Sequence, residues 1–391
     1  MWSTTLTKLF RQTRRRIANA CVSKLFLFSA AHGLYPYKYN SNTRRFTTSK
    51  WLAYYWPLAN VLIITLIIYT YLLNLKLTIV ELIAAKPLNI LLACIHWLFS
   101  ITALFVNLTR NWFGRHEFLS LHNTLLGLHN QQQRWQQKWS SQKPNQKLAE
   151  FYDNYLIAKC VMTLLQIASS IRTNLGIKPH PTLDYVFHAL AKVLVKNVTL
   201  LTVANFYFAL LNICQQLKQL NCNFKEVMER SAENVHSVHN LPSEDFTDIE
   251  FEMRYSIVGG DNKAKACSSC SSSRTIGAIA IGDLCRQYME LCHLTKRIYK
   301  LFEWQVLLFL AIMLYGGVMS SFYFLVYLGG KVWSKDLFSP TLFLQIFIVN
   351  ILDLYCYMVL CEEAMTASKE TTFLLRELYQ LQGLSKDIEQ D

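Results

Sequence analysis

Runs of uncharged apolar residues recur along this chain, with polar segments between them. Six runs are long enough to form membrane-crossing helices, at 52–75, 87–109, 155–171, 193–215, 305–329 and 338–361. The hydrocarbon core of a bilayer is about 30 Å thick and a helix rises about 1.5 Å per residue, so roughly 20 apolar residues cross it. Backbone polar groups in lipid must bond within their own helix. The pattern therefore predicts an all-α polytopic membrane protein with six transmembrane helices.

Three of these runs contain a single charged residue, and its position in the run indicates what should surround it. Lys159 and Lys196 lie near the starts of their runs, where a long side chain can reach the headgroups while its stem stays in lipid. Asp353 lies deeper in its run, and a carboxylate costs about 2.5 to 3.5 kcal/mol at a helix centre. Asp353 and Asn350 share one helical face. A contact with another helix and a place beside an ion path are both open for this pair.

The distribution of Lys and Arg predicts the orientation. Thirty of these residues precede the first run, follow the last, or lie in the two long loops, whereas six lie in the loops on the opposite side. Because cytoplasmic loops are enriched in Lys and Arg, the amino terminus is expected in the cytoplasm. The expected division is a cytoplasmic amino-terminal segment at 1–51, a transmembrane domain at 52–361 with cytoplasmic loops at 110–154 and 216–304, and a cytoplasmic amphipathic tail at 362–391.

The first fifty residues allow two interpretations. The basic run 14–16 followed by the apolar stretch 25–31 resembles a cleaved signal peptide, but that stretch is at the short end of the usual range. An amphipathic segment on the anionic inner leaflet is the favoured interpretation.

Several segments outside the apolar runs also show helical spacing. Trp135 and Trp139 lie four residues apart in the Gln-rich segment 131–147, which predicts an ordinary solvated helix continuing out of the bilayer. The segments 217–235 and 283–301 are predicted to be helical as well. In the tail, apolar residues recur at helical spacing, at Leu374, Leu378 and Leu381. The last run should therefore continue as an amphipathic helix, whose apolar face needs a partner in a long loop or a neighbouring subunit.

Between the two helical segments of the second long loop, residues 258–275 are dominated by Gly, Ser and Cys and indicate a flexible insert. Cys267 and Cys270 form a CxxC pair, but a zinc site needs two further ligands at fitting spacing. The nearest cysteines, Cys285 and Cys292, do not repeat the pair. No metal site is expected.

Composition excludes several other classes of protein. Hydrophobic residues make up 52% of the chain and charged residues 17%, which is too apolar for a set of soluble domains. The net charge of +13 is spread over membrane-flanking segments, so nucleic acid is not an expected partner. No metalloprotease, hydrolase or nucleotide-binding motif is present, and no pair of carboxylates lies within the runs. Neither an enzymatic activity nor a cofactor is expected.

A few polar and aromatic residues inside the runs are candidates for a binding pocket. With the amino terminus inside, they lie near the middle or in the outer halves of their helices. The candidate ligand-binding residues are His96, Trp97, Gln166, Ser169, Tyr315, Tyr323, Phe324 and Gln345. Aromatic walls with a few hydrogen-bonding groups suit a small organic ligand. Plain interhelical packing is the alternative for each residue.

Local sequence then resembles a known family. The segments that carry the resemblance are HGLYPYKY at 32–39, NTRRF at 42–46, KW at 50–51 and LCRQYMEL at 284–291. Together with the chain length and the cytoplasmic orientation, they are similar to insect gustatory receptors. The resemblance implies a tastant-gated, cation-permeable channel that assembles as a tetramer in the plasma membrane of sensory neurons. It also implies an outward-facing ligand pocket among the transmembrane helices, and cytoplasmic helices that pack around a central pore.

One departure from the family is apparent. Gustatory receptors have seven spans, and a threonine-tyrosine to glutamine-phenylalanine signature lies in the seventh, which lines the pore. After Cys361 no run of even ten uncharged apolar residues follows, so this chain is expected to lack the seventh span and its signature. A chain truncated before the pore helix and a diverged subunit that needs a partner to conduct are both open. A six-span transporter, or a non-conducting scaffold or regulatory subunit, is the alternative. Transporters often contain internal repeats, and none is seen here.

Overall fold

The computed structural model describes residues 2–40, 45–82, 87–139, 146–175, 183–239, 270–328 and 338–388. Its elements are α1 (Trp2–Ala31), β1 (Tyr37–Asn40), β2 (Arg45–Thr48), α2 (Lys50–Leu82), α3 (Pro87–Trp139), α4 (Gln146–Leu175), α5 (Leu183–His239), α7 (Cys270–Leu328) and α8 (Phe338–Ile388). The described part of the chain is nearly all helical, which confirms the predicted class apart from one two-stranded hairpin.

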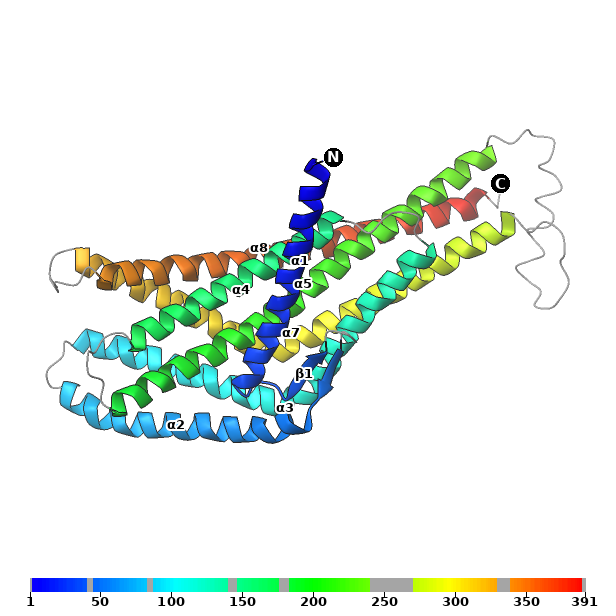
Figure 1. Cartoon of the computed structure of the whole chain (residues 1–391). Helices are drawn as coiled ribbons and strands as arrows, with labels where there is room; N and C mark the ends of the chain where they lie inside the picture. The colour runs from blue at the N-terminus through cyan, green and yellow to red at the C-terminus, as the bar shows by residue number, and fades with distance from the viewer. Residues whose placement is uncertain are drawn as a thin grey trace.

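The long helices run side by side, and α1 crosses them at a steep angle (Figure 1). Helix α5 lies at the centre, because it packs against α1, α2, α3, α4, α7 and α8. Its apolar stretch is 78% buried, whereas the corresponding stretches of the other candidate spans are at most 33% buried. The apolar residues of α5 therefore form the core, and the outer helices leave apolar faces for lipid.

Five helices in the described part of the chain are long and apolar enough to cross a membrane. The qualifying stretches are Lys50–Thr70, Gln146–Thr173, Leu183–Arg230, Ala280–Val326 and Leu344–Leu378. They overlap five of the six predicted spans. The remaining prediction, 87–109, lies in α3, where several side chains are outside the description. The number of spans and the cytoplasmic amino terminus stay predictions.

Four helices continue far beyond the lengths that a bilayer requires. Helices α3, α5, α7 and α8 contain 53, 57, 59 and 51 residues. The helices predicted at 217–235 and 283–301 are present as parts of α5 and α7, and α8 continues the last apolar run without a break. Residues 258–269 of the predicted insert lie outside the described part of the chain. Residues 270–275 form the start of α7.

The extended ends of these helices share a small apolar core of their own. Leu374 and Leu378 of α8 pack in one buried cluster with Phe224 of α5 and Leu284 of α7. The partner surface predicted for the tail is therefore the second long loop of the same chain. Trp135 of α3 joins this cluster and is 4% exposed, so the expectation of an ordinary solvated helix was wrong at this position. The helical spacing was predicted correctly, but the face of α3 that carries Trp135 packs against the other helices.

Helix α1 ends in a Schellman motif that turns the chain toward the bundle. The Gly33 N–H donates to the Ala30 carbonyl and the Leu34 N–H donates to the Ser29 carbonyl, at 3.0 and 2.9 Å. Gly33 has φ of 67°, and a Cβ there would lie 3.1 Å from Ala59 of α2. Glycine is required for both reasons. The chain then forms the antiparallel hairpin β1–β2, in which Tyr37 pairs with Thr48 and Asn40 with Arg45.

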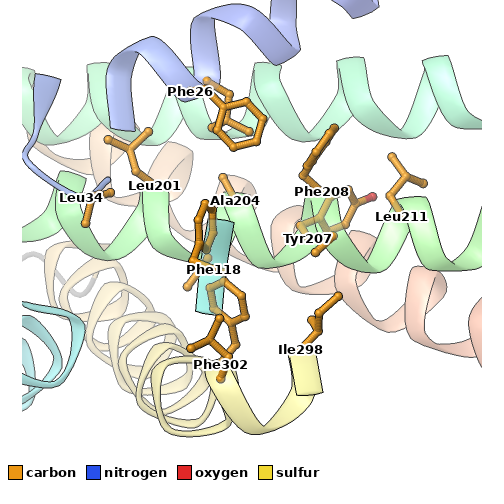
Figure 2. Close-up of a cluster of buried hydrophobic side chains, with 14 of the residues drawn as sticks. Phe26, Leu34, Phe118, Leu201, Ala204, Tyr207, Phe208, Leu211, Ile298 and Phe302 are labelled. Atoms are coloured by element: carbon orange, nitrogen blue, oxygen red, sulfur yellow. The ribbon is translucent and has the colours of Figure 1, made fainter. Parts of the chain in front are cut away.

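Aromatic residues dominate the core beside α1. Figure 2 shows Phe26 of α1, Phe118 of α3, Phe302 of α7 and Phe208 of α5 around the centre of the bundle. His122 lies among them and is 1% exposed. Its ring centroid is 3.9 Å from that of Phe118, and its Nδ1 hydrogen-bonds the Phe118 carbonyl at 3.1 Å. Burial lowers the pKa of His122 to about 4, so the imidazole is neutral in the folded protein.

His122 should make stability depend on pH. Because its pKa is lower in the folded than in the unfolded chain, its full contribution is present above the unfolded value of about 6.5 and is lost as the pH falls toward about 4. The loss should be roughly 3 kcal/mol. In thermal unfolding of the purified protein, His122→Phe should flatten this part of the pH profile. The exposed His116, replaced by Phe, is the control; an unchanged profile in His122→Phe would contradict the assignment.

Candidate functional site

Polar side chains form a ladder between α4 and α8, on two helices that run in opposite directions (Figure 1). At one end, the Gln345 Nε2 donates to the Ser169 Oγ at 3.3 Å. In the middle, the Gln166 Nε2 lies 3.4 Å from the Asn350 Oδ1 and 3.3 Å from the Asp353 Oδ2. Residue numbers fall along α8 as they rise along α4, so side chains far apart in sequence meet at matching depths.

The other end of the ladder is a buried ion pair. The Lys159 Nζ lies 2.5 Å from the Asp353 Oδ1, and the two side chains are 4% and 0% exposed. Both residues lie within predicted spans. The ammonium is also 4.5 Å from the centroid of the Tyr357 ring, and more distant from the rings of Tyr207 and Phe309. Carboxylate and aromatic faces together replace the water that the ammonium loses.

The pair connects four helices at one point. Lys159 belongs to α4, Tyr207 to α5, Phe309 to α7, and Asp353 and Tyr357 to α8. The Tyr357 hydroxyl donates to the Val203 carbonyl of α5 at 2.6 Å, which fixes the ring beside the ammonium. A movement of α4 relative to α8 would change the distance between opposite charges in a medium of low dielectric constant.

The position of the Lys159 side chain differs from the prediction. A lysine near the start of its run was expected to reach the headgroups, but it points into the bundle. Asp353 was expected to face protein or water, and its complete burial against Lys159 and Gln166 confirms this. A sequence signal for the pair existed, because two spans each carry a lone lysine and another carries a lone aspartate, but it did not choose between Lys159 and Lys196.

In the middle of the ladder, one buried hydrogen-bond acceptor has no partner among the described residues. The Gln166 Oε1 is buried and has no hydrogen-bond partner within the described ranges, although the Nε2 of the same amide is used twice. A buried amide oxygen without a donor costs about 1 to 3 kcal/mol. A ligand or a water that donates a hydrogen bond at this point would recover that energy.

The structure thus brings together five of the predicted site residues: Gln166, Ser169, Gln345, Asn350 and Asp353. Tyr315 of α7 is half-buried, and its ring centroid is 6.1 Å from that of Phe99 on α3. The next residue, Gly316, faces the ladder, since a Cβ there would lie 3.8 Å from the Asn350 Nδ2. Phe324 is half-buried on α7.

The side chains of His96, Trp97 and Tyr323 lie outside the described part of the structure, so their place relative to the ladder is untested. The complete pocket therefore stays a prediction. In the ranges that the structure describes, no three His, Cys, Asp or Glu side chains gather closely enough to hold a metal ion.

Two comparisons with known proteins relate this helical architecture to others. A model of the 7tm chemosensory receptor family matches residues 24–391. The chain is also similar to a Drosophila melanogaster protein named gustatory receptor for bitter taste 22e. The two sequences are 19% identical over 357 residues, which cover 91% of this chain and 79% of the relative. Both matches extend over nearly the whole chain.

Proposed function

Because the chain belongs to the 7tm chemosensory receptor family, we propose that it is a gustatory receptor that forms one subunit of a tastant-gated cation channel. Its ligand is a small organic molecule, bound among the transmembrane helices in a pocket that opens outward. The α4–α8 ladder carries this proposal, because its polar side chains contact one another between two predicted spans and leave one buried acceptor without a partner among the described residues.

The ladder also suggests the chemistry of the ligand. The open acceptor at Gln166 requires a donor, and the partly exposed amide of Gln345 lies at the expected outer end. The remaining candidates, His96, Trp97, Tyr315, Tyr323 and Phe324, supply aromatic surface. A partly apolar molecule with one hydrogen-bond donor, such as a hydroxyl or a protonated amine, suits this combination.

The buried ion pair suggests how binding is coupled to gating. Gln166 contacts Asp353 directly, so a ligand that engages the Gln166 amide acts on the junction of α4, α5, α7 and α8. A ligand shifts a conformational equilibrium only by its difference in affinity for the two states. Rearranged hydrogen bonds around Asp353 would provide that difference.

The extended helices supply a surface for other subunits. Met289 of α7 and Met365 and Phe373 of α8 are more than half exposed on the segments that continue beyond the spans. Exposed apolar side chains gathered on one part of a molecule are typical of interaction surfaces. The proposed assembly is a homo- or hetero-tetramer in the plasma membrane of a sensory neuron, with these segments and the amino terminus in the cytoplasm.

Replacing Gln166 by leucine should strongly reduce the sensitivity of the response to ligand. The change removes the open acceptor and the two hydrogen bonds to α8, while the side-chain size is nearly kept. We expect at least about a tenfold loss of sensitivity, since a hydrogen bond to a charged group contributes about 1.5 to 3 kcal/mol. The measurement is whole-cell recording from cells that co-express the chain with a seven-span gustatory receptor subunit that supplies the pore-lining span, during application of a panel of bitter alkaloids and sugars.

The control is Gln131→Leu, an identical change at an exposed position on α3. Surface biotinylation verifies that both variants reach the plasma membrane. Tastant-evoked current in the wild type and in Gln131→Leu, but not in Gln166→Leu, supports the site. Equal currents in all three remove the ladder from the ligand site, and uptake of a tastant without current favours the transporter alternative.

A further inference from the structure

Helix α1 packs on the bundle with one face and leaves an apolar face uncovered. The packed face includes Ala18, Val22, Leu25 and Ser29, which are all buried. The uncovered face carries large apolar side chains, namely Leu9 (61% exposed), Phe10 (75%), Ile17 (46%), Leu27 (61%) and Phe28 (44%). Residues about eighteen positions apart lie about five turns apart on the same side of a helix, as Leu9 and Leu27 do, and Phe10 and Phe28. These five side chains therefore form a stripe along the helix, the α1 stripe.

Two cations lie on the same side of the helix as the α1 stripe. With about 100° of rotation per residue, Arg16 lies beside the line of Leu9 and Leu27, and Lys24 lies between that line and the Phe10–Phe28 line. Both cations are exposed, and neither hydrogen-bonds nor ion-pairs with any residue in the described part of the chain.

The other arginines of this region are used within the bundle. Arg11 and Arg14 pair with Glu150 of α4, with atoms 3.2 and 2.8 Å apart. Arg15 lies close enough to the buried Asp153 of α4 to interact with its carboxylate. Arg16 and Lys24 are thus the cations that α1 offers to a partner outside the bundle.

Both ends of α1 lie near the expected boundary of the membrane. Glu150, which accepts the arginine ion pairs of α1, lies five residues before the third predicted span. At the other end, the Tyr55 hydroxyl of α2 donates to the Ala31 carbonyl at 2.6 Å, near the start of the first predicted span.

Exposed aromatic residues mark the same level. Trp51 and Tyr54, in the first turns of α2, are 86% and 80% exposed. Such side chains gather where the hydrocarbon meets the headgroups. Because α1 crosses the spans at a steep angle (Figure 1), it lies along the surface of the bilayer, where its uncovered face can meet lipid.

The charge around the α1 stripe favours an anionic partner. Residues 1–50 contain ten Lys and Arg and no Asp or Glu, and Glu81 is the first acidic residue of the chain. A second copy of the same face would bring cations against cations, and like charges across an interface are costly. An anionic bilayer surface neutralises the cations, and its acyl region receives the apolar side chains.

We propose that the α1 stripe binds anionic phospholipid, with the chemistry of phosphatidylserine, in the leaflet predicted to be cytoplasmic. Arg16 and Lys24 donate to phosphate and carboxylate oxygens of the headgroups, since long cationic side chains can extend from an apolar face to that level. The stripe lies about 5 to 10 Å into the boundary between headgroups and acyl chains.

The structure adds two points to the expectation of a segment on this leaflet. The face that contacts lipid is separate from the face that packs on the bundle, and part of the basic run 14–16 is directed at α4. The proposal depends on the membrane architecture and not on the tastant site.

Native mass spectrometry of the purified full chain tests the headgroup preference. The protein is released from micelles that contain equal amounts of phosphatidylserine and phosphatidylcholine, and the bound lipids are counted. The wild type should retain phosphatidylserine at least about tenfold over phosphatidylcholine, because each Lys or Arg near an anionic surface contributes a factor of about five. Arg16→Gln combined with Lys24→Gln should lower this ratio at least about fivefold.

The matched control combines Arg134→Gln with Lys369→Gln, which removes the same charges at exposed positions on the extensions of α3 and α8. Its ratio should equal that of the wild type. Equal retention of both lipids by the wild type would overturn the proposal. Equal losses in the two double variants would overturn it as well, because the preference would then follow net charge alone.

A second arm identifies what covers the stripe. The photoreactive amino acid p-benzoylphenylalanine replaces Phe28, and the full chain is irradiated in nanodiscs of phosphatidylserine and phosphatidylcholine. We expect covalent capture of lipid at this position. The same replacement at Phe373, which is 59% exposed on the extension of α8, should capture none. Capture of a second receptor chain at Phe28, or of no lipid there, would contradict the proposal.

Discussion

Replacing Lys159 by methionine is expected to lower the free energy of unfolding by about 3 to 5 kcal/mol, the largest effect of any single change considered for this receptor. The substitution keeps the length of the side chain but leaves the Asp353 carboxylate buried without its counter-ion. The expected result is a strongly reduced amount of receptor at the cell surface and a lower thermal midpoint in detergent.

The exposed pair of Lys225 and Glu370 provides the matched control. Its atoms are 2.6 Å apart, but the side chains are 54% and 39% exposed. Lys225→Met should cost only about 0 to 1 kcal/mol, because solvent screens the charges. Equal losses in Lys159→Met and Lys225→Met would contradict the assignment of the buried pair as the critical one.

A double variant separates charge from packing. Lys159→Met with Asp353→Leu removes both charges and keeps apolar volume, and such replacements are often neutral or stabilising. We expect the double variant to recover most of the surface expression lost in Lys159→Met. It should nevertheless respond less to tastants, because the hydrogen bond between Gln166 and Asp353 is lost. Recovery of both expression and response would limit the pair to a structural role.

The second large effect concerns the core formed by the extended helices. Leu374→Ala should lower the free energy of unfolding by about 2 to 5 kcal/mol, since it opens a cavity beside Phe224 and Leu284. Leu374 is 4% exposed. Thermal unfolding of the purified receptor, together with size-exclusion chromatography of its assembly state, measures the loss.

Its neighbour Phe373 is the control, because it is larger but 59% exposed. Phe373→Ala should change the stability of a single subunit by no more than about 0.5 kcal/mol. If Phe373→Ala instead abolishes assembly while Leu374→Ala does not, the surface proposed for subunit contacts is supported. The buried cluster then contributes less to assembly than its low exposure suggests.

Much of the architecture could be predicted from the sequence because lipid imposes strict local rules. An uncharged run of about 20 residues has few alternatives to a helix, since backbone groups in lipid must bond internally. The same reasoning identified Asp353, because a carboxylate in such a run has to face protein or water. The apolar spacing of Leu374 and Leu378 similarly predicted an amphipathic helix with a buried face. These conclusions depend only on residues that are close together in the sequence.

Other features depend on which helices meet, and periodicity alone does not contain that information. Lys159 could reach the headgroups or a counter-ion, and the antiparallel packing of α4 and α8 decided in favour of Asp353, 194 residues away. The burial of Trp135 likewise could not be predicted from its spacing, because it results from the packing of α3 against α5 and α7. The position of Tyr35 depends on the glycine turn at Gly33 and on the stacking of its ring on Phe118 of α3, which lie in separate segments.

The sequence by itself determined that the chain is a helical membrane protein, where most of its candidate spans lie, and that Asp353 faces protein or water, because these follow from the free energy of placing each residue in lipid. The tertiary structure alone decided that Lys159 neutralises Asp353, and that Gln166 of α4 hydrogen-bonds Asn350 and Asp353 of α8. Those contacts depend on distances between helices, which only the packing of side chains around α5 sets.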